Sequence, residues 1–206
     1  MLRTILFDLG NVLLKFSHAR MCRQIAELGG ISPELLRREL LESPLQMEFE
    51  RGRMSEAEFQ SRLERFCGCV MPIEDLRIAA ADIFEPNPGM REIVEQLRER
   101  GLRLVLLSNT CVTHIDFIRQ KYSLLDLFDD VVLSYEVGAL KPEDAIFEAA
   151  KSRIQCSPAE CFYTDDIAPY VDAGRKQGLQ AELFATPHQL RDQLRARGID
   201  LPESRV

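Results

Sequence analysis

The chain has 206 residues, of which 46% are hydrophobic and 29% are charged, and its formal net charge is −7. These values exclude a disordered chain and a disulfide-stapled miniprotein, and the length suffices for an α/β core with a small inserted domain. The acidic balance, without a block of lysines or arginines, argues against nucleic acid as a partner.

The sequence also indicates in which part of the cell the protein is expected. Its apolar runs are too short for a membrane span, which needs roughly 20 residues. The N-terminal residues run straight into Asp8 without the pattern of a cleaved signal peptide, so we expect a cytoplasmic protein that does not contact membranes. We expect the six cysteines to be reduced thiols. Cys67 and Cys69 lack the second cysteine pair or nearby histidine of a metal site.

The first predicted element is a buried strand at residues 4–7, a short apolar run that ends at Asp8. Residues 17–84 then have helical patterns throughout, which predict helices at 19–28, 33–42, 56–66 and 73–83. Ser32 and Ser55 supply typical helix starts. An all-helical insertion after the first strand of a parallel sheet predicts a lid over the carboxyl end of that strand.

The rest of the chain alternates between strands and helices. Strands are predicted at 103–107, 131–133, 161–163 and 181–184. Helices are predicted at 89–100, 112–121, 144–153, 168–177 and 189–197. This alternation is typical of an α/β fold with a Rossmann-like parallel sheet. We therefore expect a core domain at 1–16 and 85–206 and a helical cap domain at 17–84, with a return hinge at 86–89.

Polar clusters follow the predicted strands in this order: Asp8, Ser108-Asn109-Thr110, Lys141 and Asp165-Asp166. Phosphoryl transfer needs a nucleophile, cations that neutralise the equatorial oxygens of the phosphoryl group, and hydrogen-bond donors that hold this group in line for attack. Asp8 suits attack on phosphorus, with Asp165 and Asp166 holding Mg²⁺ beside it. Lys141 would supply positive charge, while Ser108 and Asn109 would donate hydrogen bonds.

These clusters resemble, in order and spacing, the four motifs of the haloacid dehalogenase superfamily: FDLGNV at 7–12, LSNT at 107–110, GALKPE at 138–143 and YTDD at 163–166. The resemblance covers nearly the whole chain. It implies a helical cap after the first motif, a phospho-aspartyl intermediate on Asp8 and Mg²⁺ bound by the acids of the fourth motif. It also implies that Lys141 and Ser108 bind the phosphate. The opening motif is similar to that of sugar-phosphate phosphatases, glucose 1-phosphate phosphatases among them, so we expect a small phosphorylated metabolite as substrate.

The sequence departs from the superfamily pattern at Gly10, where the phosphatases usually carry a second aspartate that protonates the leaving group. The backbone carbonyl of Gly10 still suits the metal contact made at that position. General acid–base help is worth about 10²- to 10⁴-fold, so we expect slow turnover or a substrate with a good leaving group. Lys15 and Ser17 stand where relatives often place a further acid, and Tyr170 stands where many have asparagine.

Two other functions stay open at this stage. One is metal-free 2-haloacid dehalogenation, and the other is phosphometabolite or partner binding with little turnover. His18 is expected on the surface or at the hinge, although its position also allows it to face the pocket. Arg51 and Arg53 are read as solvated or as contacts for a second anionic group. The sequence is compatible with a monomer or a homodimer.

Overall fold

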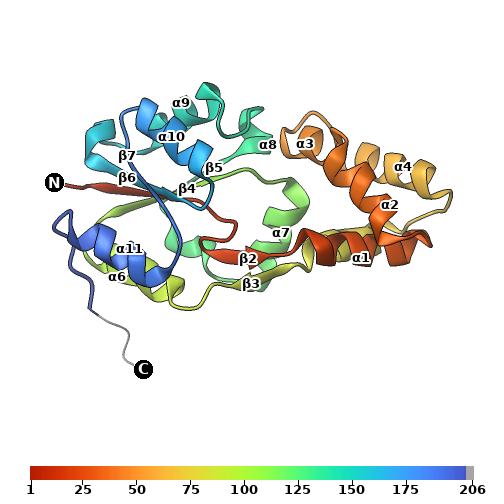
Figure 1. Ribbon diagram of the computed structural model, residues 1–206, viewed down its shortest axis with the longest axis horizontal. Helices are drawn as coiled ribbons and strands as arrows, with labels where there is room; N and C mark the ends of the chain where they lie inside the picture. The colour runs from red at the N-terminus through yellow and green to blue at the C-terminus, as the bar shows by residue number, and fades with distance from the viewer. Residues whose placement is uncertain (203–206) are drawn as a thin grey trace.

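The computed structural model describes residues 1–202, and its centre is a five-stranded parallel sheet in the order β5-β4-β1-β6-β7 (Figure 1). The strands are β1 (Thr4–Phe7), β4 (Arg103–Ser108), β5 (Asp130–Leu133), β6 (Cys161–Asp165) and β7 (Gln180–Leu183). All five predicted strands are present, with small shifts at their ends. Because β1 is central, the residue that follows it lies between the ends of two neighbouring strands.

Helices cover both faces of this sheet. One face carries α6 (Met90–Glu99), α7 (Val112–Lys121) and α11 (Pro187–Arg195), and the other carries α9 (Asp144–Arg153) and α10 (Ala168–Lys176). Successive side chains of a strand point to opposite faces, so Ile5 and Phe7 join the first apolar cluster and Leu6 joins the second. Burial on both faces explains why the strands read as continuous apolar runs. The predicted α/β fold is confirmed.

Short elements complete the core. They are α8 (Ser134–Val137) and two 3₁₀ turns, η2 (Leu125–Leu127) and η3 (Pro158–Glu160). All six cysteines are free thiols, as expected. Over residues 1–202, no helix combines the length and the apolar character that crossing a bilayer requires.

Between β1 and β4 the chain forms the helical insertion (residues 17–84), which stands beyond the carboxyl ends of the strands and far from the N-terminus (Figure 1). Its helices are α1 (His18–Gly29), α2 (Pro33–Arg37), the π-helical turn η1 (Arg38–Glu42), α3 (Leu45–Glu50), α4 (Glu56–Cys67) and α5 (Ile73–Ala81). Ser55 starts α4 with a capping box to Glu58, as its sequence suggests. Helix α3 was not predicted. The role of the insertion as a cap domain stays a prediction.

A two-stranded antiparallel sheet joins the insertion to the core, and it too was not predicted. It consists of β2 (Leu14–Phe16) and β3 (Phe84–Pro86). The Tyr122 hydroxyl donates to the Phe84 carbonyl at 2.7 Å. The segment expected to be a hinge follows β3, and there the buried Asn87 amide donates to the Val12 carbonyl at 2.8 Å. These bonds fix both connections of the insertion to the sheet.

Candidate active site

The polar residues singled out in the sequence meet at the carboxyl edge of the sheet. Asp8 directly follows β1, while Ser108 ends β4 and Asp165 ends β6. Because β1 pairs in parallel with both β4 and β6, these three residues come to the same edge. Lys141 reaches it from the loop between α8 and α9. The structure therefore brings the predicted residues together, while their catalytic roles stay predictions.

Lys141 lies between two carboxylates. Its side chain is 1% exposed, and Nζ donates to Asp8 Oδ1 at 2.6 Å and to Asp165 Oδ2 at 2.6 Å. A third bond goes to the Leu107 carbonyl at 3.1 Å. Burial disfavours the charged amine, but the two carboxylates outweigh it and raise the pKa of Lys141 above its usual value. The three donors of the ammonium group are thus occupied, and its charge is retained.

Asn109 holds the backbone of Lys141 in place. Its Oδ1 accepts from the Lys141 amide at 2.7 Å, and its Nδ2 donates to the Lys141 carbonyl at 3.1 Å. A weaker bond links Nδ2 to the Tyr170 hydroxyl at 3.4 Å. The side-chain amide is therefore engaged with protein groups, and the phosphate contact expected of Asn109 stays a prediction.

The two acids of the fourth motif have different surroundings. Asp165 is fully buried and, besides Lys141, accepts from the Tyr163 hydroxyl at 2.5 Å and from the Ile167 amide at 2.9 Å. Asp166 is half-buried, accepts from the Asn11 amide at 3.0 Å and lines a cavity that Asp165 does not line. Asp166 is therefore the acid of this pair that faces the space above Asp8.

The carboxylates form a compact cluster. Asp8, Asp165 and Asp166 each offer an oxygen, and these atoms lie within 4.8 Å of one another. Burial raises the pKa of Asp8 to about 7, an effect that Lys141 opposes and Asp165 strengthens. A divalent cation would offset the repulsion among these groups, and carboxylate and carbonyl oxygens are the protein ligands that Mg²⁺ takes. The donor set therefore fits Mg²⁺.

A cavity of about 160 Å³ opens beside Asp8. From the core it is lined by Asp8, Leu9, Gly10, Asn11, Ser108, Asn109, Thr110, His114, Lys141, Asp166, Ile167 and Tyr170. From the insertion and its base it is lined by Phe16, His18, Glu50 and Phe84. His18 is exposed, as expected, and also borders this cavity. His114 is buried, and burial together with the nearby His18 lowers the pKa of His114 to about 4, so its ring is neutral.

Sequence reasoning missed several of these lining residues. Glu50 ends the unpredicted α3, and Phe16 and Phe84 lie on the unpredicted β2 and β3. His114 lies on a correctly predicted helix, but its sequence gives no sign that it turns inward. One contact near the cavity could have been predicted, the hydrogen bond from Tyr163 to Asp165. A buried tyrosine hydroxyl needs a partner, and an acid stands two residues later in the chain.

Gly10 is explained by its neighbour Phe16. A Cβ atom added at Gly10 would lie 2.8 Å from Phe16 Cε1 and 3.2 Å from Cδ1. Gly10 is not among the residues with positive φ, so space rather than backbone conformation favours glycine there. The ring of Phe16 thus occupies the space into which a side chain at position 10 would extend. An aspartate at this position would displace that ring.

The arginines of the insertion do not reach the cavity. Arg51 forms a two-bond ion pair with Glu143 of the core, one bond being 2.8 Å from Nη1 to Oε2. Arg53 pairs with Glu48 at 3.3 Å. Neither arginine lines the cavity beside Asp8. The alternative that they contact a second anionic group of a ligand finds no support in these contacts, because acids of this chain hold both arginines.

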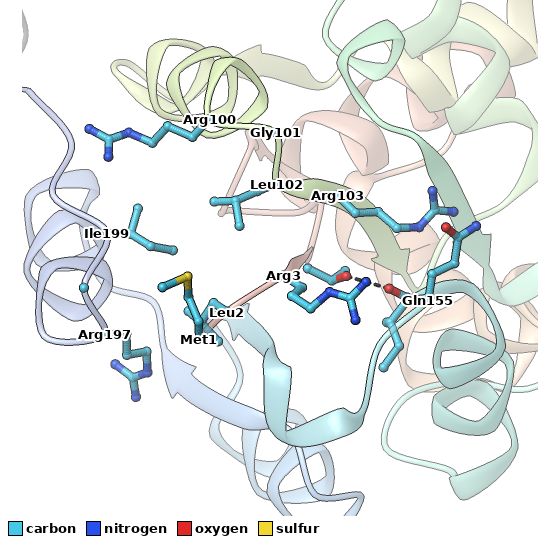
Figure 2. Close-up of a pocket in the computed structure, with 13 residues that line it drawn as sticks. Met1, Leu2, Arg3, Arg100, Gly101, Leu102, Arg103, Gln155, Arg197 and Ile199 are labelled. Atoms are coloured by element: carbon cyan, nitrogen blue, oxygen red, sulfur yellow. Dashed lines mark hydrogen bonds between the residues drawn. The ribbon is translucent and has the colours of Figure 1, made fainter.

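A larger cavity, of about 540 Å³, lies at the opposite, amino-terminal edge of the sheet (Figure 2). Four arginines line it: Arg100 extends to one side, Arg3 and Arg103 extend toward the side of Gln155, and Arg197 lies apart from them (Figure 2). Arg103 pairs with Asp130 at 3.1 Å, and Arg197 pairs with Glu182 at 2.6 Å. No aspartate or glutamate of residues 1–202 is among its lining residues, so the carboxylate cluster beside Asp8 makes the smaller cavity the better candidate site.

Comparisons with known proteins identify the family of the chain. Residues 2–178 match the haloacid dehalogenase-like hydrolases. Phosphatase MT3486 of Mycobacterium tuberculosis is 34% identical over 106 residues, which cover 51% of this chain and 49% of that protein. The chain thus matches about half the length of that phosphatase. D-ribitol-5-phosphate phosphatase of Bacteroides thetaiotaomicron is 25% identical over 187 residues, which cover 87% of this chain and 90% of that protein.

A solved structure supports the fold. A HAD family enzyme of Bacteroides thetaiotaomicron, in complex with magnesium and inorganic phosphate, superimposes with a TM-score of 0.80. The two sequences are 22% identical, and the match covers 90% of this chain and 96% of that one. The two proteins therefore share a common fold over most of their length.

Proposed function

The chain belongs to the haloacid dehalogenase-like hydrolase family, and from this membership we propose that it is a Mg²⁺-dependent phosphatase of a small phosphorylated metabolite. The observation that carries the proposal is the buried Asp8 carboxylate, held by Lys141 and clustered with Asp166 at the cavity. The relatives named as phosphatases of phosphorylated carbohydrates and of D-ribitol 5-phosphate support the substrate class.

The proposed reaction has two steps at Asp8. In the first, a carboxylate oxygen attacks phosphorus, the bond to the leaving oxygen breaks, and a phospho-aspartyl group forms. In the second, water attacks the same phosphorus, phosphate departs and the Asp8 carboxylate returns. Lys141 neutralises negative charge beside Asp8 throughout, and the buried Ser108 hydroxyl at the cavity wall suits a hydrogen bond to a phosphate oxygen.

A magnesium ion would be held by the Asp8 and Asp166 carboxylates and the Gly10 carbonyl, all three being cavity-lining residues. When bound, it supplies positive charge that orients the phosphate and stabilises the charge of the transition state. We assign Asp165 a different part, because its oxygens are taken by Lys141, Tyr163 and Ile167. Asp165 orients Lys141, as Asn109 does from the backbone side.

Glycine at position 10 sets a limit on this chemistry. Gly10 has no side chain to protonate the leaving oxygen, and Phe16 fills the adjacent space. We therefore expect turnover to depend on the leaving group, with aryl phosphates cleaved faster than alkyl phosphates. Where the leaving oxygen needs a proton, the lack of this acid should lower the rate of hydrolysis by about 10²- to 10⁴-fold.

The direct test is phosphate release from para-nitrophenyl phosphate and a panel of sugar and polyol phosphates, with and without Mg²⁺. We expect release that requires Mg²⁺ and is lost in Asp8→Asn. Asp172→Asn is a matched control, because Asp172 is an exposed acid on α10 that pairs with Arg175. Undiminished release by Asp8→Asn would overturn the proposal. Chloride release from chloroacetate without Mg²⁺ would favour a dehalogenase instead.

A further inference from the structure

Glu50 is a cavity-lining acid that the proposed reaction does not use. It is the last residue of α3, and its backbone carbonyl accepts from the Ser134 hydroxyl of the core at 2.7 Å. The next residue, Arg51, pairs with Glu143 of the core. These two contacts tie the end of α3 to the sheet domain and hold Glu50 against the cavity beside Asp8.

The carboxylate of Glu50 has no cationic partner. Among residues 1–202, its side-chain hydrogen bond comes from the buried Gln46 amide at 2.9 Å, and no lysine or arginine pairs with it. Burial raises the pKa of Glu50 above its ordinary value, and the bond from Gln46 offsets this in part. A partly buried acid without a counterion is costly, so a ligand group that can satisfy it gains free energy on binding.

The rest of the lining offers no free lysine or arginine to a second anionic group. Among residues 1–202, Lys141 is the one lysine or arginine that lines this cavity, and Asp8, Asp165 and Leu107 take its three donors. Two histidines, His18 and His114, also line it, and desolvation lowers the pKa of both, which favours their neutral rings. Aromatic rings of Phe16, Phe84 and Tyr170 make up much of the remaining wall.

We infer that the leaving group of the substrate carries no second anion and presents a hydroxyl or amino group that donates a hydrogen bond to Glu50. This inference rests on the proposed phosphatase function and names the substrate class of that site. A carboxylate or second phosphate on the leaving group would face Glu50 at short range with no cation to neutralise it. Like charges in a partly desolvated site repel strongly, which excludes such substrates.

The test uses three phosphate esters of equal length that differ in one terminal group: 2-hydroxyethyl phosphate, 2-aminoethyl phosphate and 2-phosphoglycolate. For the wild-type protein with Mg²⁺, we expect kcat/KM for the hydroxyl or the amino ester to exceed that for phosphoglycolate at least tenfold. A factor of ten corresponds to about 1.4 kcal/mol. In Glu50→Gln, which keeps the shape and removes the charge, we expect this ratio to fall at least tenfold because phosphoglycolate is cleaved better.

Glu48→Gln is the matched control, since Glu48 lies on the same helix, pairs with Arg53 and does not line the cavity. Its ratio should equal that of the wild type. If wild type cleaves phosphoglycolate as well as the other two esters, or if Glu50→Gln keeps the wild-type ratio, the inference is wrong. The wild-type ratio alone decides if the variant does not fold. If the wild-type protein cleaves none of the three esters and does not cleave para-nitrophenyl phosphate either, the proposed phosphatase function is refuted instead.

Discussion

Replacing Lys141 with methionine tests how the site is held together. Methionine keeps an unbranched side chain that is one atom shorter, and it removes the charge that stands between Asp8 and Asp165. In wild type, each carboxylate is 2.6 Å from Nζ, and the Lys141 side chain is 1% exposed. Solvent therefore cannot replace the lost cation, and both acids are left buried without compensation in the absence of metal.

The expected loss of stability is large. Removing one partner of a buried ion pair typically costs 3 to 5 kcal/mol, so we expect Lys141→Met to lower the free energy of unfolding by about 4 kcal/mol at pH 7. The pKa of Asp8 is already about 7 with Lys141 present. Without Lys141 it rises further, so the folded variant holds protons that the unfolded chain has lost. From pH 5 to pH 7 the folded states of both proteins keep this proton, so the deficit changes little; above pH 7 the wild-type protein releases it and the variant does not, so the deficit should grow toward pH 9.

The assay is urea unfolding followed by circular dichroism at pH 7 and pH 9 in metal-free buffer. Lys151→Met is the matched control, because Lys151 pairs with Glu148 at the surface, where such a pair contributes about 1 kcal/mol or less. A loss for Lys141→Met no larger than that of the control would refute the reasoning. A deficit that is smaller at pH 9 than at pH 7 would also refute it.

Three further predictions concern the surroundings of Asp8. In thermal melts, Mg²⁺ should raise the melting temperature, and the increase should be smaller at pH 5 than at pH 8 because the raised pKa of Asp8 keeps Asp8 protonated at pH 5. Asp166→Asn should remove most of this increase, and an unchanged increase would exclude Asp166 as a metal ligand. Glu50→Gln should increase the free energy of unfolding at pH 7, because an acid whose pKa is raised in the folded state destabilises the protein as the pH rises above the ordinary pKa of that acid. In urea titrations this increase should vanish near pH 4. Gly10→Ala should lower the free energy of unfolding by about 1 to 3 kcal/mol through contact with Phe16, and adding Phe16→Leu should recover part of that loss. Equal stabilities of Gly10→Ala and wild type would show that the ring moves freely.

The core of the fold was predictable because its strands are covered on both faces. A run such as residues 4–7 must then be apolar throughout, and such runs are visible in a single sequence. The polar residues that end these runs converge because parallel strands present their carboxyl ends at one edge. Asp8, Ser108 and Asp165 therefore came together as expected, although their roles in the reaction stay predictions.

The cavity wall was not predictable from the same patterns. Helix α3 has six residues and begins after Pro44, too short a segment for helical periodicity to show. Strands β2 and β3 have three residues each, so no alternation marks them. Glu50, Phe16 and Phe84 were missed for this reason, since their place depends on packing between segments far apart in the chain.

The partners of polar side chains were equally hidden in the sequence. Asn109 bonds the backbone of Lys141, and Arg51 pairs with Glu143 of the core. Both are contacts between residues distant in the chain, which residue type alone does not specify. The sequence identified the chemistry at Asp8 as a hypothesis, and the structure supplies the neighbours that make that hypothesis testable.

The central claim is that Asp8 becomes phosphorylated during turnover. The most direct measurement is peptide mass spectrometry of the protein after acid quenching of a reaction with para-nitrophenyl phosphate and Mg²⁺. We predict one phosphoryl group on the peptide that contains Asp8, labile to base and absent when Mg²⁺ is omitted. A phosphoryl group on another residue, or steady phosphate release while this peptide never carries one, would contradict the claim.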